Sequence, residues 1–215
     1  NNTIKNSTID GNNGTYAMRL CADLTCAGGA TNTGNIFANN TIINATTLLF
    51  LDASASNNTF YLNNFSNAGT LPTYYINDQN GSNFFNATYD GKNQGNIYGN
   101  VINGTINVTG TTNSSISGLY IGNMGAGVPY NNTTSGGMFS CNFQGCADYA
   151  PLTANKTALL VVSARTFPIG SQLLSNVSWI AGYCNATSLT NTTVFYNYTW
   201  YNGTTIISSG QYQNG

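Results

Sequence analysis

The chain has 215 residues, of which only 5% are charged, against about 25% in ordinary soluble domains. Its five basic residues and its net charge of −1 exclude a nucleic-acid-binding protein and a polybasic membrane-surface protein, because both need clustered Lys and Arg. The 41% hydrophobic content excludes a disordered chain, and the many aromatic and β-branched residues, with no Glu and little Lys, predict an all-β fold.

Residues 1–153 carry a weak repeat of short apolar segments. The segment at 35–40 recurs 24 residues later at 59–64 and again at 83–86, with a fainter copy at 2–6. Such a period predicts a solenoid of short parallel strands, because one coil cannot bury its apolar face without its neighbours. Asparagines near the corners are expected to stack into hydrogen-bonded ladders. A leucine-rich repeat would need a Leu scaffold and a helical side, and neither is present.

This part of the chain resembles the right-handed parallel β-helix repeats of archaeal-type surface proteins. The repeat-like segments are 35–44, 59–65 and 89–96, and the segments that resemble the end of such a helix are 116–122, 129–131 and 148–153. The resemblance implies a right-handed parallel β-helix over residues 1–153. The same fold occurs in pectin-cleaving and other sugar-processing enzymes, so the fold alone does not give the function.

Residues 154–215 have a different pattern, with longer alternating segments that predict strands at 158–165, 176–185 and 193–201. Cys184 followed by Trp200 is part of the immunoglobulin-sandwich signature. A sandwich takes about seven strands, and only about four fit here. We therefore expect an incomplete immunoglobulin-like β-sandwich. Its missing strands would come from the downstream chain or from a partner subunit, as in donor-strand complementation.

Five cysteines include two pairs of equal spacing, Cys21 with Cys26 and Cys141 with Cys146. In an exported chain we expect both pairs to form local disulfides. A four-cysteine metal site is the alternative, although zinc sites usually have tighter spacings, and cross-pairing between the two halves is also open. We expect no metal. Cys184 is left unpaired or pairs between subunits.

Twenty N-x-[Ser/Thr] sequons, none with Pro in the middle, mark candidate N-glycosylation sites. With 36 Asn and 46 Ser and Thr among 215 residues, about 8 sequons would arise at random. The excess predicts a heavily glycosylated exported protein with its acceptors on the surface. The acceptors are Asn1, Asn6, Asn13, Asn39, Asn44, Asn57, Asn64, Asn80, Asn86, Asn103, Asn107, Asn113, Asn131, Asn132, Asn155, Asn176, Asn185, Asn191, Asn197 and Asn202.

Catalytic chemistry has few candidates, because the chain has neither His nor Glu. Asp52 and Asp78 are 26 residues apart, about one coil, and could face one glycosidic bond as a carboxylate pair. Both lie in turn-like sequences, and we expect turn residues rather than a catalytic pair. We predict no catalytic residue.

Aromatic residues on the predicted strands allow a second hypothesis. Tyr74 and Tyr75, Phe84 and Phe85, and the segment 196–201 could stack on carbohydrate. Alternate residues of a strand face opposite sides, so we expect alternate members of these runs to fill the core instead.

The sequence as a whole predicts a non-enzymatic, extracellular structural glycoprotein. We expect its partners to be copies of itself in a cell-surface filament, pilus-like fibre or surface layer, with covalent N-linked glycans as its only added groups. No apolar run approaches the roughly 20 residues of a membrane span. Because the start lacks an initiator Met and a signal peptide, we expect a segment of a longer precursor. The alternative is a carbohydrate-binding or carbohydrate-cleaving β-helix adhesin.

Overall fold

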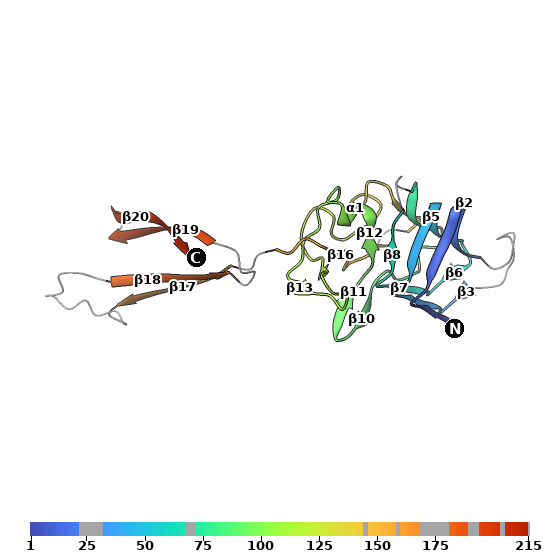
Figure 1. The fold of residues 1–215 in the computed structure, drawn as a ribbon, viewed down its shortest axis with the longest axis horizontal. Coiled ribbons are helices and arrows are strands. Elements are labelled where there is room, and N and C mark those ends of the chain that lie inside the picture. The colour runs from blue at the N-terminus through green and yellow to red at the C-terminus, as the bar shows by residue number, and fades with distance from the viewer. Residues whose placement is uncertain are drawn as a thin grey trace. The chain divides into compact units, whose positions relative to one another are not determined.

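A computed structural model gives the fold (Figure 1). It describes residues 1–21, 32–67, 72–143 and 146–157 with their side chains, and the backbones of 160–167, 181–188, 194–202 and 205–214. The described residues form twenty strands and one helix, α1 (Gly99–Ile102), which has only four residues. The predicted all-β class is confirmed. The chain divides into two compact units, 1–157 and 158–215.

The first sheet of unit 1–157 consists of three parallel strands. These are β1 (Thr3–Lys5), β4 (Ile36–Ala38) and β7 (Thr59–Tyr61), paired in that order. A further bridge joins Thr59 to Phe84. In-register pairing stacks Phe37 on Phe60 with ring centroids 4.8 Å apart, and Phe85 follows at 5.7 Å from Phe60. A column of aromatic rings therefore lines the inner face of this sheet.

The second sheet has nine strands and is centred on β5 (Thr41–Leu51). Its other members are β2 (Thr8–Leu20), β8 (Asn64–Phe65), β9 (Tyr74–Asp78), β12 (Ile97–Tyr98), β13 (Thr112–Asn113), β14 (Tyr120–Ile121), β15 (Phe139–Cys141) and β16 (Leu152–Thr153). β2 pairs with one side of β5, and β8 and β9 share the other side; all three pairs are parallel. β12 pairs in parallel with both β8 and β16, and β15 pairs in parallel with β9. At the far edge, β14 pairs antiparallel with β16 and β13 pairs antiparallel with β14. Figure 1 shows β2, β5, β8 and β12 in this order across the unit.

Two smaller pairs complete the unit. β3 (Asn32–Thr33) and β6 (Ala55–Ser56) pair in parallel. β10 (Ala87–Tyr89) and β11 (Lys92–Gln94) form an antiparallel hairpin. Its two turn residues, Asp90 and Gly91, have φ of 52° and 68°, which is the geometry that short hairpin loops require and that Asp-Gly readily adopts.

The spacing between stacked positions differs from the predicted uniform 24 residues. Ile36 pairs with Thr59 after 23 residues, Thr59 with Phe84 after 25, and Thr3 with Ile36 after 33. The prediction of a fixed period is therefore wrong. Side chains alternate along a strand, so a shift of one residue would turn an inward ring outward. The corners between strands differ in length, and these differences keep the inward residues of successive coils aligned.

The first of two asparagine ladders fixes that register. It runs through Asn2, Asn35, Asn58 and Asn83, and in each step the backbone N–H and the side-chain amide donate to Oδ1 of the next asparagine at 2.9–3.2 Å. Asn83 then donates Nδ2 to both carboxylate oxygens of Asp78 at 3.1 Å. The expected asparagine ladder is confirmed, and it ends on a buried carboxylate.

The second ladder has the same direction and the same kind of end. It runs from the N–H of Ser7 through Asn40 and Asn63 to Asn96, with steps of 3.0–3.1 Å. Asn96 donates its backbone N–H to Oδ2 of Asp148 at 2.7 Å. Each link points its donors toward the later coil, so the amide dipoles align. A carboxylate, which only accepts, ends such a chain.

The core shows which members of the aromatic runs face inward. Tyr75 and Phe85 are fully buried, whereas Phe84 is 55% exposed and Tyr74 is half-buried. The prediction that alternate members fill the core is confirmed for these two runs. The third run, 196–201, has its side chains outside the described residues.

The described residues of unit 158–215 form two antiparallel pairs. β17 (Leu160–Phe167) pairs with β18 (Ala181–Ser188), and β19 (Val194–Asn202) pairs with β20 (Thr205–Asn214). The ladder between β19 and β20 carries an irregularity at Trp200 and Tyr201. The assignment of this unit to an immunoglobulin-like sandwich stays a prediction.

Candidate functional site

Two corners of unit 1–157 combine an outward asparagine with an inward one. Asn39 is exposed and has φ of 53°, Asn40 is buried in the second ladder, and Thr41 begins β5. Residues 57–59 repeat this arrangement, with a φ of 54° at Asn57. Asparagine tolerates the left-handed conformation better than most residues. The sequence Asn-Asn-Thr is therefore both a corner and an N-glycosylation sequon.

Fifteen of the twenty sequon asparagines have described side chains, and none of them is buried. Ten are exposed and five are half-buried. The exposed ones are Asn1, Asn6, Asn13, Asn39, Asn57, Asn103, Asn107, Asn113, Asn132 and Asn155, and the half-buried ones are Asn44, Asn64, Asn80, Asn86 and Asn131. The other five sequons lie in unit 158–215, where side chains are outside the described residues. Every described acceptor residue is thus at least partly exposed to solvent.

The remaining asparagines behave differently. Fifteen asparagines outside the acceptor positions have described side chains, and seven of them are buried. These are Asn35, Asn40, Asn58, Asn63, Asn83, Asn96 and Asn100. A random distribution would put roughly half of the seven at acceptor positions. Left-handed corners account for part of this separation between buried asparagines and sequon asparagines. They do not account for all of it, because only five of the fifteen described acceptors have positive φ.

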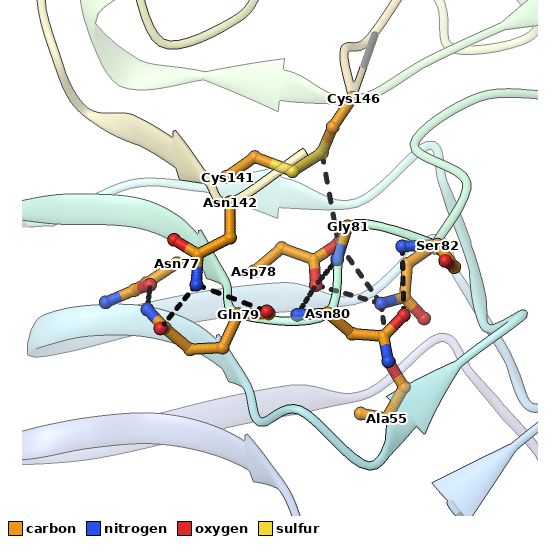
Figure 2. The surroundings of a disulfide bond; sticks show 11 residues. Ala55, Asn77, Asp78, Gln79, Asn80, Gly81, Ser82, Cys141, Asn142 and Cys146 are labelled. Carbon is orange, nitrogen blue, oxygen red and sulfur yellow. Dashed lines mark hydrogen bonds between the residues drawn. A yellow bond between two sulfur atoms is a disulfide. The ribbon is translucent and has the colours of Figure 1, made fainter. Parts of the chain in front are cut away.

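Cys141 and Cys146 form a disulfide with Cα atoms 6.3 Å apart, as the spacing predicts. Figure 2 shows it beside the turn that follows β9. Asn142, next to it, donates Nδ2 to Oε1 of Gln79 at 3.0 Å and its backbone N–H to the carbonyl of Asp78 at 3.1 Å. The disulfide segment is therefore tied to the turn by hydrogen bonds from Asn142.

Of the other three cysteines, only Cys21 has a described side chain. Cys21 takes part in a disulfide. Cys26, its predicted partner, lies outside the described residues, and so does the side chain of Cys184. The proposed pairings of these two cysteines stay predictions.

Asp78 and the disulfide sulfurs form the cluster that comes nearest to a metal site among the described residues. One carboxylate oxygen of Asp78 and the sulfurs of Cys141 and Cys146 lie within 4.8 Å of one another. Zinc is held by cysteine as thiolate, and both sulfurs are bonded to each other here. Burial raises the pKa of Asp78, although hydrogen bonds from Gly81, Asn83 and Asn80 lower it. The oxidised cluster therefore offers a metal ion no thiolate ligand.

Asp52 directly follows β5 and Asp78 is the last residue of β9; both accept hydrogen bonds from the turn that comes next, and they do not stack. Asp52 accepts from the N–H of Ser54 at 2.7 Å, and Asp78 accepts from the N–H of Gly81 at 2.8 Å. β5 and β9 pair with an offset of 27 residues, which sets Asp78 beside Leu51 rather than beside Asp52. The register thus gives no stacked carboxylate pair of the kind that the 26-residue spacing allowed.

Asp148 is the most perturbed carboxyl of the described residues. It is fully buried and accepts from Asn96, from the N–H of Ala150 at 2.9 Å and from the hydroxyl of Tyr98 at 3.2 Å. Burial raises its pKa to about 7, while these hydrogen bonds lower it. Tyr98 stacks on Tyr130 with ring centroids 4.0 Å apart. The core thus shields this carboxyl group from solvent.

Within the described part of the chain, a surface groove of about 630 Å³ is a candidate binding site. Its lining residues come from three places: the stacked corners at the ends of β1, β4 and β7, called the column of corners below; the β10–β11 hairpin; and the segment after β13. They are Lys5, Asn6, Ala38, Asn39, Tyr61, Leu62, Tyr89, Asp90, Ser115 and Ile116. Tyr61 and Tyr89 lie with ring centroids 5.8 Å apart, and Tyr89 is 45% exposed. The sequence singled out neither tyrosine, because the groove joins segments that no motif connects.

Comparison with protein-family models, with curated proteins and with solved structures finds no match to this chain. Among the described residues, no helix is both long enough and apolar enough to span a membrane. The site therefore has to be interpreted from its own geometry.

Proposed function

We propose that this protein is a heavily N-glycosylated, non-enzymatic structural protein outside the cell, and the repeating subunit of a surface filament, pilus-like fibre or surface layer. The observation that carries the proposal is the separation of the asparagines. Seven asparagines serve the interior, and none of the fifteen described acceptors is among them. An oligosaccharide can be attached only where the amide reaches solvent, so this distribution suits an array of glycan acceptors.

The chemistry of the rest of the chain supports the same proposal. With 5% charged residues, ordinary surface charge does not account for solubility, and attached sugar would supply polar surface instead. The Cys141–Cys146 disulfide suits an oxidising, extracytoplasmic compartment. The described lining of the groove holds one carboxylate, Asp90, whereas glycoside hydrolysis normally needs two. We therefore favour a structural over a sugar-cleaving protein.

We further propose that residues 1–153 form a short right-handed parallel β-helix of the kind that archaeal-type surface proteins carry. Strands at successive repeats pair in parallel in three separate sheets, which supports this assignment. A right-handed path is the usual one for parallel crossovers. A crystal structure or a cryo-electron-microscopy map would test it through the chain path from β4 to β7.

For residues 154–215 we propose a partial immunoglobulin-like sandwich that strands from downstream chain or a partner copy complete. Two-stranded antiparallel pairs are marginally stable alone and expose edges that can accept another strand. Head-to-tail completion between copies does not close, so it would build a fibre. Electron microscopy of native material tests the assembly: fibres or a layer are expected, and dispersed monomers at high concentration would refute it. If the isolated 215-residue protein polymerises, the missing strands come from a neighbouring copy rather than from downstream chain.

A further inference from the structure

The groove at the column of corners brings acceptor asparagines and tyrosine rings together. Its lining includes Asn6, Asn39 and Leu62, which have φ of 54°, 53° and 57° and occupy equivalent corners of three consecutive coils. The N–H of Asn39 donates to the carbonyl of Tyr61 at 3.2 Å, so the corner of Asn39 lies directly against the coil that bears this tyrosine. Neighbouring strands are about 4.8 Å apart, roughly the width of one sugar ring.

The groove's walls are held in place by hydrogen bonds. Gln94 of β11 is fully buried, and its side chain both donates to Oγ of Ser115 and accepts from the N–H of Ser115, each at 2.7 Å. The same side chain donates to the carbonyl of Tyr89 at 2.8 Å. Gln94 therefore ties the hairpin residue Tyr89 to the segment at Ser115, which fixes these two parts of the lining relative to each other.

The lining suits a sugar. Tyrosine rings present a flat apolar face to the C–H groups of a pyranose and a hydroxyl to its polar edge. Asp90 and Lys5 add an acceptor and a donor for sugar hydroxyls at the rim. The volume of about 630 Å³ is within the range of about 300–1,000 Å³ of small-molecule sites.

A glycan attached to an asparagine of the lining would be the sugar nearest to the groove. Asn39 is an exposed acceptor in the lining itself. Its Nδ2 donates to Oδ1 of Asn6 at 2.8 Å. N-glycosylation replaces one of the two amide hydrogens, so the other can keep this bond and hold the linkage in a fixed orientation. Asn6 lies one coil further from Tyr61, so Asn39 is the better placed acceptor.

We propose that the groove is an intramolecular sugar-binding site, in which the first sugars of the N-glycan on Asn39 pack against Tyr61 and Tyr89. This inference rests on the proposed glycosylation but adds a specific place for one glycan. Tethering raises the effective sugar concentration at the groove, so weak stacking contacts suffice to fill it. The glycan at Asn39 is then part of the folded surface rather than a mobile appendage.

The test uses the glycosylated 215-residue protein with its glycans in place. Tyr89→Ala is combined with Asn39→Gln in a double-mutant cycle followed by chemical denaturation. Tyr89→Ala should lower the denaturation midpoint of the wild type by more than that of the Asn39→Gln variant, in which only the contact between the Tyr61 and Tyr89 rings is lost. Tyr89→Phe, which keeps the ring, should behave as wild type, and Asn103→Gln, which removes an exposed acceptor outside the groove lining, should leave the effect of Tyr89→Ala intact.

Nuclear magnetic resonance gives a second readout that does not depend on stability. Sugar protons of the Asn39 glycan should be shifted upfield by the tyrosine rings, and the shift should be lost in Tyr89→Ala. Glycopeptide mass spectrometry of the same sample separates the two possible failures. If Asn39 is occupied and Tyr89→Ala costs the same in both backgrounds without any ring-current shift, the groove proposal is wrong while the glycoprotein proposal stands. An unoccupied Asn39, or coupling seen only when copies associate, also overturns it.

Discussion

Asn96 donates both its backbone N–H and its side-chain amide to the same oxygen of Asp148, at 2.7 and 3.4 Å. This contact joins positions 52 residues apart and ends the second asparagine ladder on a buried acceptor. The first ladder ends in the same way on Asp78. Because an ionised carboxylate has only acceptor atoms, neither ladder leaves a buried donor unpaired at its far end when its aspartate is ionised.

Removing one link of a ladder should destabilise the first unit. Asn63→Ala deletes an acceptor for two donors of Asn40 and a donor to the carbonyl of Phe37 at 2.9 Å, all in the interior. Unpaired buried polar groups cost about 1–3 kcal/mol each, so a loss of about 3 kcal/mol or more in the free energy of unfolding is expected. Urea denaturation measures it. Asn123→Ala, at an exposed position, serves as control and should change stability by less than about 0.5 kcal/mol.

Gly95 should tolerate no side chain, because a Cβ there would lie 1.9 Å from Oδ1 of Asp148. Gly95→Ala must displace the carboxylate that ends the ladder, so we expect a lower melting temperature and loss of cooperative unfolding. Gly14→Ala is a milder comparison, since its added carbon meets only the carbonyl of Gly11 at 3.0 Å. Equal melting temperatures of the two variants would show that Asp148 can move freely.

Stability should fall as the pH rises from about 4 to about 7. Burial raises the pKa of Asp148 from 3.8 to about 7, so in this range the folded protein keeps a proton that the unfolded chain has lost. The raised pKa of Asp78 acts in the same direction. Urea denaturation between pH 4 and 8 measures the slope, and Asp148→Asn should reduce it. If stability instead rises with pH, hydrogen bonds to Asp148 outweigh burial and hold it ionised.

The disulfide should stabilise the fold through the unfolded chain. Cys141 and Cys146 are 5 residues apart, and closing so short a loop is worth about 2 kcal/mol in the loop-entropy account. Replacing both with Ser should lower the free energy of unfolding by that amount. Non-reducing peptide mapping of the wild type should show this bond and also the predicted Cys21–Cys26 bond. Free thiols at Cys141 and Cys146 in native material would contradict the first assignment.

The sequence predicted the all-β class and the asparagine ladders, because composition and corner asparagines are local signals. The period was wrong because corners of different length follow Asn35 and Asn58, and only the contacts between coils reveal which asparagines stack. The two carboxylates that end the ladders could not be found in this way. Asp148 meets Asn96 from 52 residues away.

The candidate site was predicted to a similar extent. Sequons are read directly from the sequence, and at Asn39 the exposure of the acceptor follows from a corner that turns Asn39 outward and Asn40 inward. The groove could not be predicted. Tyr61 and Tyr89 lie on different strands, and their rings meet only because the β10–β11 hairpin folds back beside the corner column.

Site-by-site glycan occupancy of native material tests the central claim most directly. Glycopeptide mass spectrometry of the intact protein should find sugar on more than half of the 20 sequons, and among the exposed acceptors in particular. Such a result is expected because every described acceptor reaches solvent while the interior takes its asparagines from other positions. Occupancy of fewer than about five sequons would contradict the account. The exposure of the acceptor asparagines would then have no connection with attached sugar.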